Sequence, residues 1–221
     1  RMRSKKNTKL SLFLGGSFLV VAQFFYSHHV FAETEESIVI PLIQRVTPSG
    51  QGPTFQAGTN LAPLARATIF VRDIEESLKL YRDILGLTPM FDNLWKGSGI
   101  NAIMGTKGRE LRATVLMAGS SVQGNLGIYQ LYNATESVTE PRQSPDTRIG
   151  DFAIVFPTND IWRLTDEISA AGYPIVSPPV SLIERDNFKV QPVEMMFRDR
   201  DGVLVNLVQA GVKKDSGISQ E

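Results

Sequence analysis

The sequence predicts an α+β fold built from two copies of one β-α-β-β-β unit. The first copy begins at residues 67–90, ATIFVRDIEESLKLYRDILGLTPM, which read as strand, turn, amphipathic helix, glycine stop and strand. A weaker copy begins at residues 152–176, FAIVFPTNDIWRLTDEISAAGYPIV. The number of residues between the capping aspartate and the terminating glycine is nearly the same in the two copies, from Asp73 to Gly86 and from Asp160 to Gly172. A duplicated unit predicts a site where the two copies meet.

In the first unit, residues 65–71 are rich in β-branched and aromatic side chains and predict a strand. Asp73 is a good helix N-cap because its carboxylate can accept the free N–H groups of the first turn. Gly86 can adopt the left-handed conformation that ends a helix. We expect strands at 87–92, 110–117 and 127–132. The glycine-rich stretch 93–108, which contains Trp95, is expected to be a long connection or a loop with a short turn of helix. The apolar stripe of the helix, including a core tyrosine, is Ile74, Leu78, Tyr81 and Leu85.

In the second unit, residues 151–156 predict a strand, and Asn159 or Asp160 caps the helix that follows. Gly172 ends that helix. Residues 174–182 contain three prolines, which favours an edge strand. Residues 193–197 and 203–208 predict the last two strands, joined by a hairpin turn at 199–202, DRDG. The second helix has its own apolar stripe, Ile161, Leu164, Ile168 and Ala171.

The two units divide the chain into six segments. We predict a signal peptide at 1–32, a connector at 33–63 and the first module at 64–133. A polar linker at 134–149, the second module at 150–211 and a tail at 212–221 follow. The connector includes an apolar run at 38–43 that suits an edge strand and a turn-rich tract at 47–60.

The first 32 residues follow the order of a secretory signal peptide. They carry five basic residues and no acid, and residues 10–25 are mostly apolar. Small or compact residues at Val30 and Ala32 precede an acidic stretch at 33–36. The pattern predicts cleavage after Ala32 and a periplasmic or secreted protein with no stable membrane insertion afterwards. The alternative is an uncleaved anchor, since residues 10–32 are long enough to span a bilayer.

Composition excludes several kinds of function for the mature chain. The signal peptide takes five of the 23 basic residues, so 18 basic and 23 acidic residues remain, which disfavours a nucleic-acid partner. The sequence has no cysteine, and both histidines, His28 and His29, lie in the predicted signal. Histidine or cysteine catalysis and the metal sites built on imidazole or thiolate are therefore excluded. We expect no cofactor.

Three short motifs of the first unit resemble those of the vicinal oxygen chelate superfamily. They are Val71-Arg72-Asp73-Ile74, Leu80-Tyr81 and Leu85-Gly86-Leu87, and the resemblance extends over about residues 64–211. That superfamily includes glyoxalase I, bleomycin-resistance proteins and extradiol dioxygenases. The resemblance implies two tandem βαβββ modules that form a curled mixed sheet around a central cleft. In metal-dependent relatives, the first and last strands of each module supply the metal ligands.

At those strand positions this chain has Arg66, Gln130, Asp151 and Asn206. Arg66 cannot bind a cation because its guanidinium has only donors and stays charged. We therefore expect no metal there. We hypothesise that Arg66 and Asp151 occupy equivalent places in the two modules and pair across one cavity, leaving guanidinium donors for an anionic or carbonyl ligand. The predicted ligand-binding residues are Arg66, Thr68, Gln130, Tyr132, Asp151, Asn206 and Glu194.

Three functions remain open at the level of sequence. The first is an exported protein, like the bleomycin-resistance branch, that binds a small organic molecule between its modules without a catalytic metal. The alternative is a lyase, isomerase or dioxygenase with an oxygen-ligand metal site around Asp151. The third is an interaction domain with a collapsed cleft. The sequence also allows a homodimer.

Overall fold

The computed structural model of this protein describes residues 37–49, 58, 62–133, 140–181 and 190–213. These residues belong to one compact unit, residues 34–221. The predicted signal peptide, its two histidines and most of the tail lie outside the described residues, as do parts of the connector and of the linker.

The strands of the described residues follow the predicted duplication. The elements of the first module, with the connector strand that joins it, are β1 (Ile38–Pro41), β2 (Arg66–Phe70), α1 (Ile74–Leu78), the π-helical turn η1 (Lys79–Ile84), β3 (Thr88–Lys96), α2 (Ser98–Met104), β4 (Glu110–Met117) and β5 (Asn125–Tyr132). The elements of the second module are β6 (Ala153–Pro157), α3 (Ile161–Ala170), β7 (Ile175–Ser181), β8 (Val190–Arg198) and β9 (Leu204–Lys213).

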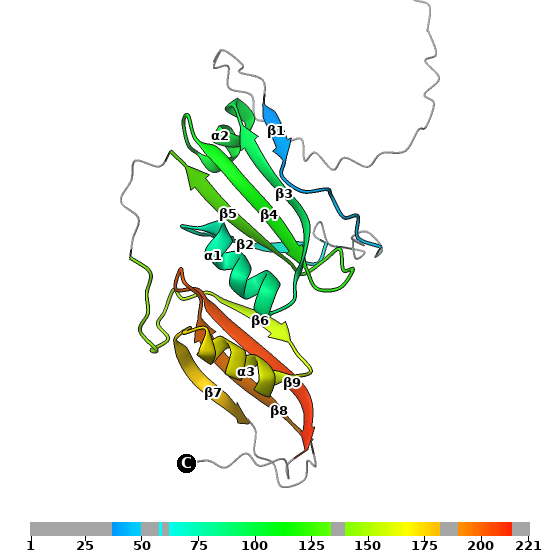
Figure 1. Ribbon diagram of the computed structural model, residues 1–221, viewed down its shortest axis with the longest axis vertical. Helices are drawn as coiled ribbons and strands as arrows, with labels where there is room; N and C mark the ends of the chain where they lie inside the picture. The colour runs from blue at the N-terminus through cyan, green and yellow to red at the C-terminus, as the bar shows by residue number, and fades with distance from the viewer. Residues whose placement is uncertain (1–36, 50–57, 59–61, 134–139, 182–189, 214–221) are drawn as a thin grey trace, which may run out of the picture. The chain divides into compact units, whose positions relative to one another are not determined.

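Each module of the described chain has its own sheet. The first has the order β1-β3-β4-β5-β2 and the second has the order β6-β9-β8-β7. The first strand of each module pairs in parallel with the last, β2 with β5 and β6 with β9, and the other pairs are antiparallel. In Figure 1, α1 lies across the sheet of the first module and α3 lies across the sheet of the second. The predicted pair of βαβββ units is confirmed.

Local sequence signals account for the helix ends. Asp73 accepts hydrogen bonds from the backbone N–H groups of Glu75 and Glu76, so its predicted capping role is confirmed. Gly86 and Gly172 both have positive φ, as a glycine at a helix end allows. Asp160 stands at the N-cap of α3, although its carboxylate bonds the guanidinium of Arg163 instead of the helix backbone.

The end of β3 differs from the sequence prediction. β3 continues to Lys96 instead of ending at residue 92, and Trp95 lies in this strand opposite Leu111. The extension is stabilised by neighbours on both sides, because β1 pairs with the same stretch and Val39 lies opposite Trp95. The prediction of a loop at 93–96 was wrong because a local pattern does not reveal partners that lie 15 or more residues away.

The hydrophobic core lies between each sheet and its helix and is continuous across the two modules. Tyr81 is fully buried, as its place in the helical stripe predicts. Its hydroxyl donates a 2.8 Å hydrogen bond to Oδ2 of Asp199 in the β8–β9 turn. In the same turn, Asp201 Oδ1 accepts from Nε of Arg72 at 3.0 Å. The predicted hairpin turn therefore also ties the second module to the first.

Candidate functional site

The two modules can be compared residue by residue through their hydrogen bonds. Gln130 accepts from the N–H of Ile74, the first residue of α1, and Gln209 accepts from the N–H of Ile161, the first residue of α3. These two glutamines are equivalent, and the strand registers extend the equivalence along both sheets. The equivalent pairs are Arg66 and Ala153, Thr68 and Val155, Asn125 and Leu204, Gly127 and Asn206, Tyr129 and Val208, and Met117 and Arg198.

This register corrects the hypothesis that Arg66 and Asp151 are equivalent. Arg66 stands eight residues before Ile74, and the residue eight before Ile161 is Ala153. Asp151 instead corresponds to a position two residues before Arg66. A strand shift of this size is invisible in a sequence pattern because a shift of two leaves every side chain on the same face.

Asp151 is paired with cations of the linker and of its own module. Its carboxylate accepts from Nη1 of Arg142 at 2.9 Å and from Nη2 of Arg198 at 3.0 Å. The pKa of Asp151 is lowered, chiefly because the carboxylate accepts the backbone N–H of Arg148 and also because it bonds Arg198. The predicted pairing of Asp151 with Arg66 is therefore wrong, since nearer cations in the linker and on β8 hold the carboxylate.

Arg198 is the buried centre of this cluster, with 1% of its surface exposed. Its guanidinium also donates to the carbonyl oxygens of Ser144, Asp146 and Gly202 at 2.6 to 2.8 Å. The linker folds back over this end of the second sheet and provides the acceptors that a buried guanidinium requires.

Gln130 lies on the helix side of its sheet. Its carboxamide accepts from the N–H of Ile74 and donates to the carbonyl oxygen of Arg72 at 2.9 Å. Both hydrogen bonds fix the turn between β2 and α1. Tyr132 is two residues further on the same strand and therefore shares this face. The amide of Gln130 is thus satisfied by backbone groups of its own module.

Asn206 and Glu194 lie together on the face of the second sheet that is turned away from α3. Nδ2 of Asn206 donates to Oε2 of Glu194 at 3.1 Å. Their neighbours on the same strands, Met195 and Leu207, point to the helix side and belong to the core. We call the sheet face turned away from the helix the distal face of each module.

The distal face of the first module holds Arg66 and Thr68. The guanidinium of Arg66 lies over the ring of Tyr129, 5.5 Å from its centroid, and Phe70 packs edge-on against the same ring at 5.7 Å. Arg66 is exposed, and within the described residues it forms no ion pair. Gly127 makes room for this arrangement, because a Cβ there would lie 2.8 Å from Oγ1 of Thr68.

The seven predicted ligand-binding residues therefore fall into separate groups. The distal face of the first module brings Arg66 and Thr68 together, that of the second brings Asn206 and Glu194 together, and Asp151 belongs to the linker cluster. In the described ranges, no hydrogen bond or ion pair joins one group to another. Their roles in ligand binding remain predictions.

The sequence prediction missed Tyr129 and Asn125, both on β5. Tyr129 is opposite Phe70 in the parallel pair of β2 and β5, and Asn125 is opposite Arg66. Residues opposite each other in a sheet share a face. Alternation along β5 separates both of them from Gln130, which was the residue chosen on that strand. A correct pairing of β2 with β5 would have been needed to find them.

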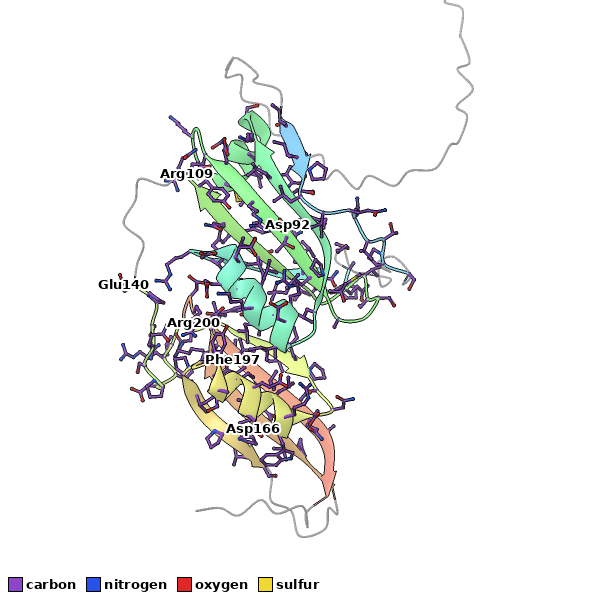
Figure 2. The ribbon with its side chains drawn as sticks, in the orientation of Figure 1. Asp92, Arg109, Glu140, Asp166, Phe197 and Arg200 are labelled. Carbon is purple, nitrogen blue, oxygen red and sulfur yellow. The ribbon has the colours of Figure 1, made fainter. Side chains whose placement is uncertain are left out.

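A second charged cluster, on the helix side of the first sheet, is structural. Asp92 on β3 is buried and accepts two hydrogen bonds from Arg112 on β4, and Arg112 also pairs with Glu75 on α1 at 2.7 Å. Asp92 lies within the first sheet in Figure 2. The hydrogen bond to Asp92 raises the pKa of Arg112. This cluster ties a helix to two strands.

Neither a metal-binding cluster nor a membrane span is found in the part of the chain that the structure describes. No three or more His, Cys, Asp or Glu side chains are grouped there as potential metal ligands. No helix among these residues has the length and apolarity that crossing a bilayer would require.

The sequence matches the Glyoxalase/Bleomycin resistance protein/Dioxygenase superfamily over residues 63–207. The chain belongs to this superfamily. No curated protein matches the sequence. Among solved structures, a glyoxalase family protein from Bacillus cereus is similar, with a TM-score of 0.56, 14% identity, and coverage of 71% of this chain and 99% of that one.

Two further solved structures are similar to this chain with lower TM-scores. A glyoxalase/bleomycin resistance protein/dioxygenase domain from Frankia has a TM-score of 0.44 and 18% identity, covering 72% of this chain and 96% of that one. A trypanothione-dependent glyoxalase I from Leishmania major has a TM-score of 0.43 and 17% identity, covering 66% and 85%.

Proposed function

We propose that this protein is an exported, glyoxalase-like member of the superfamily that binds a small organic anion and uses no catalytic metal. The ligand binds on the distal face of the first module, which is one wall of the cleft that the superfamily fold implies. Arg66 binds the anionic group, and the rings of Tyr129 and Phe70 contact the apolar part of the ligand.

The observation that carries this proposal is the exposed guanidinium of Arg66. A cation stacked on an aromatic ring keeps its in-plane N–H donors free for a planar anion. Arg142 and Arg198 are held by Asp151 and by backbone carbonyl oxygens, and the one donor of Arg142 without a partner, Nε, is buried, so both are unsuited to this role. The equivalent of Arg66 in the second module is Ala153, so the fold does not require a cation at this strand position.

The alternative enzyme reading places an oxygen-ligand metal site around Asp151. The surroundings of this carboxylate argue against it, because two guanidinium groups already occupy its oxygens. A divalent cation would have to compete with Arg142 and Arg198 at the same oxygen atoms, and hard cations generally need more than one carboxylate. The binding protein is therefore the better supported reading.

Export and dimerisation complete the proposal. The basic, apolar and small-residue order of the first 32 residues supports export, and mass spectrometry of the protein from a periplasmic extract should find Glu33 as its first residue. A second copy of the chain would cover the outer strand β6, where Val155 is 57% exposed. Sedimentation of the mature chain should then give a dimer, and a monomer at all concentrations would refute this part.

The test of ligand binding compares Arg66→Ala with the matched control Arg148→Ala. Both changes remove one exposed arginine, and Ala is the residue that the second module has at the position of Arg66. We use 3-phenylpropanoate as the probe, because it joins a carboxylate to an aromatic ring, and calorimetry as the measurement. Wild type and Arg148→Ala should bind it alike, and Arg66→Ala should bind about tenfold more weakly, as the loss of a charge-assisted hydrogen bond predicts.

Two results would contradict the proposal. One is equal binding of the probe by Arg66→Ala and wild type. The other is the absence of binding by wild type to 3-phenylpropanoate and to a panel of aliphatic and aromatic carboxylates, phosphates and sulfonates.

A further inference from the structure

Asn125 has a buried carboxamide whose oxygen accepts no hydrogen bond. The residue begins β5, is 7% exposed, and its Oδ1 has no hydrogen-bond partner. Buried side-chain oxygens in proteins nearly always accept a hydrogen bond, since an unpaired one has lost its water without compensation. An amide in this state needs an explanation.

The fold itself does not require an amide at this position. The equivalent residue in the second module is Leu204, which is also the first residue of its strand and is 1% exposed. An apolar side chain of similar volume is therefore compatible with the same place in the sheet. The first module has a polar group there and leaves it unpaired, which points to a partner from outside the chain.

Asn125 lies beside the Arg66 site on the distal face. It is directly opposite Arg66 in the parallel pair of β2 and β5, and Tyr129 follows four residues later on the same face. Roughly 13 Å of strand separates the Cα atoms of Asn125 and Tyr129 at the usual rise per residue. Gly127 between them has no side chain of its own, and Thr68 and the stem of Arg66 pack over it. A ligand bound beside this stem would have both the guanidinium and the amide as neighbours.

We propose that the ligand of this site is an organic anion that also carries an O–H or N–H donor away from its anionic group, such as a hydroxylated aromatic carboxylate. The anion binds Arg66, the body of the molecule contacts the ring of Tyr129, and the donor bonds Oδ1 of Asn125. This inference rests on the proposed function and specifies the chemical class of its ligand. Binding of such a donor compensates the unpaired amide, whereas a plain carboxylate leaves it unpaired.

The test uses two probes that differ by one hydroxyl, 3-phenylpropanoate and 3-(4-hydroxyphenyl)propanoate. Wild type should bind the hydroxylated probe about five- to tenfold more tightly, as one hydrogen bond to a buried acceptor predicts. Asn125→Leu, which introduces the residue of the second module, should bind both probes with the affinity that wild type has for the plain one. The matched control Asn159→Leu, at an exposed asparagine before α3, should keep the preference.

The outcomes separate this inference from the proposed function. Equal binding of the two probes by wild type overturns the inference and leaves the anion site intact. A preference that persists in Asn125→Leu also overturns it. If wild type binds neither probe nor the wider anion panel, the proposed function and the inference both fail. The comparison of the two probes on wild type tests the inference even where Asn125→Leu does not fold.

Discussion

The two modules share one fold but use their distal faces differently. The first has an exposed cation, aromatic rings and an unpaired amide, at Arg66, Tyr129 and Asn125. The equivalent residues of the second are alanine, valine and leucine, and its charged groups are paired with each other and with the linker. Side chains that fix structure have their hydrogen bonds satisfied within the protein, and those that bind a ligand retain unused ones. This difference supports the proposal of a ligand site in the first module.

The largest expected effect comes from Arg198→Met, which gives the second module the residue that the first has at Met117. The change removes a buried cation, leaves the backbone carbonyls of Ser144 and Gly202 without their donor and frees the linker. We expect the free energy of unfolding to fall by about 3–5 kcal/mol in urea denaturation. Met117→Leu, a volume-conserving control, should cost under about 1.5 kcal/mol. Equal effects of the two changes would refute the structural role of the cluster.

The two glutamines test whether the modules are built alike on their helix sides. Gln130→Leu removes two hydrogen bonds to backbone groups, and Gln209→Leu removes the one to the N–H of Ile161. The expected losses of unfolding free energy are about 2 kcal/mol and about 1 kcal/mol. Anion binding should survive in both variants, because neither glutamine is on a distal face. A loss of probe binding with unchanged stability in Gln130→Leu would show that it contacts the ligand after all.

Gly127→Ala tests the close packing of the distal face in the first module. The new Cβ would lie 2.8 Å from Oγ1 of Thr68 and 3.0 Å from Cδ of Arg66, so both side chains must shift. We expect a loss of about 1 kcal/mol in stability and weaker binding of 3-phenylpropanoate. Unchanged affinity would show that the position of the Arg66 side chain over this glycine is unimportant for the ligand.

The smallest effect is the pH dependence of stability, where two carboxyl groups of the second module act in opposite directions. Asp151 has a lowered pKa, so its contribution is present above the ordinary value of 3.8 and is lost as the pH falls through the lower folded value. Asp199 has a pKa raised by burial, so its contribution is present in acid and is lost as the pH rises through the folded value.

Unfolding free energies measured between about pH 5 and pH 2 should decline less steeply for Asp151→Asn than for wild type. Asp199→Asn is the matched control from the same module and should decline more steeply than wild type. Identical pH profiles for all three proteins would contradict the assigned directions.

The sequence by itself was sufficient for the fold because helix and strand signals are local. The cap at Asp73, the glycine stops and the alternation of residues 65–71 act over a few residues, and each reappears in the structure. The repeat and the motif around Leu80-Tyr81 led to the superfamily. The absence of cysteine and the position of both histidines in the first 32 residues are also properties of the sequence alone.

Which residues lie together at the candidate site depends on contacts that only the tertiary structure determines. Asp151 pairs with Arg142 and Arg198, which lie 9 and 47 residues away in the sequence. No local sequence pattern predicts which cations will pair with this carboxylate. The equivalence of Gln130 with Gln209, in place of Asn206, follows from strand register. That difference is three residues and changes the face of the sheet, whereas the shift between Asp151 and Ala153 is two residues and preserves alternation, so sequence alone cannot detect it. For the same reason, the unpaired amide of Asn125 beside Arg66 emerged only from the folded chain.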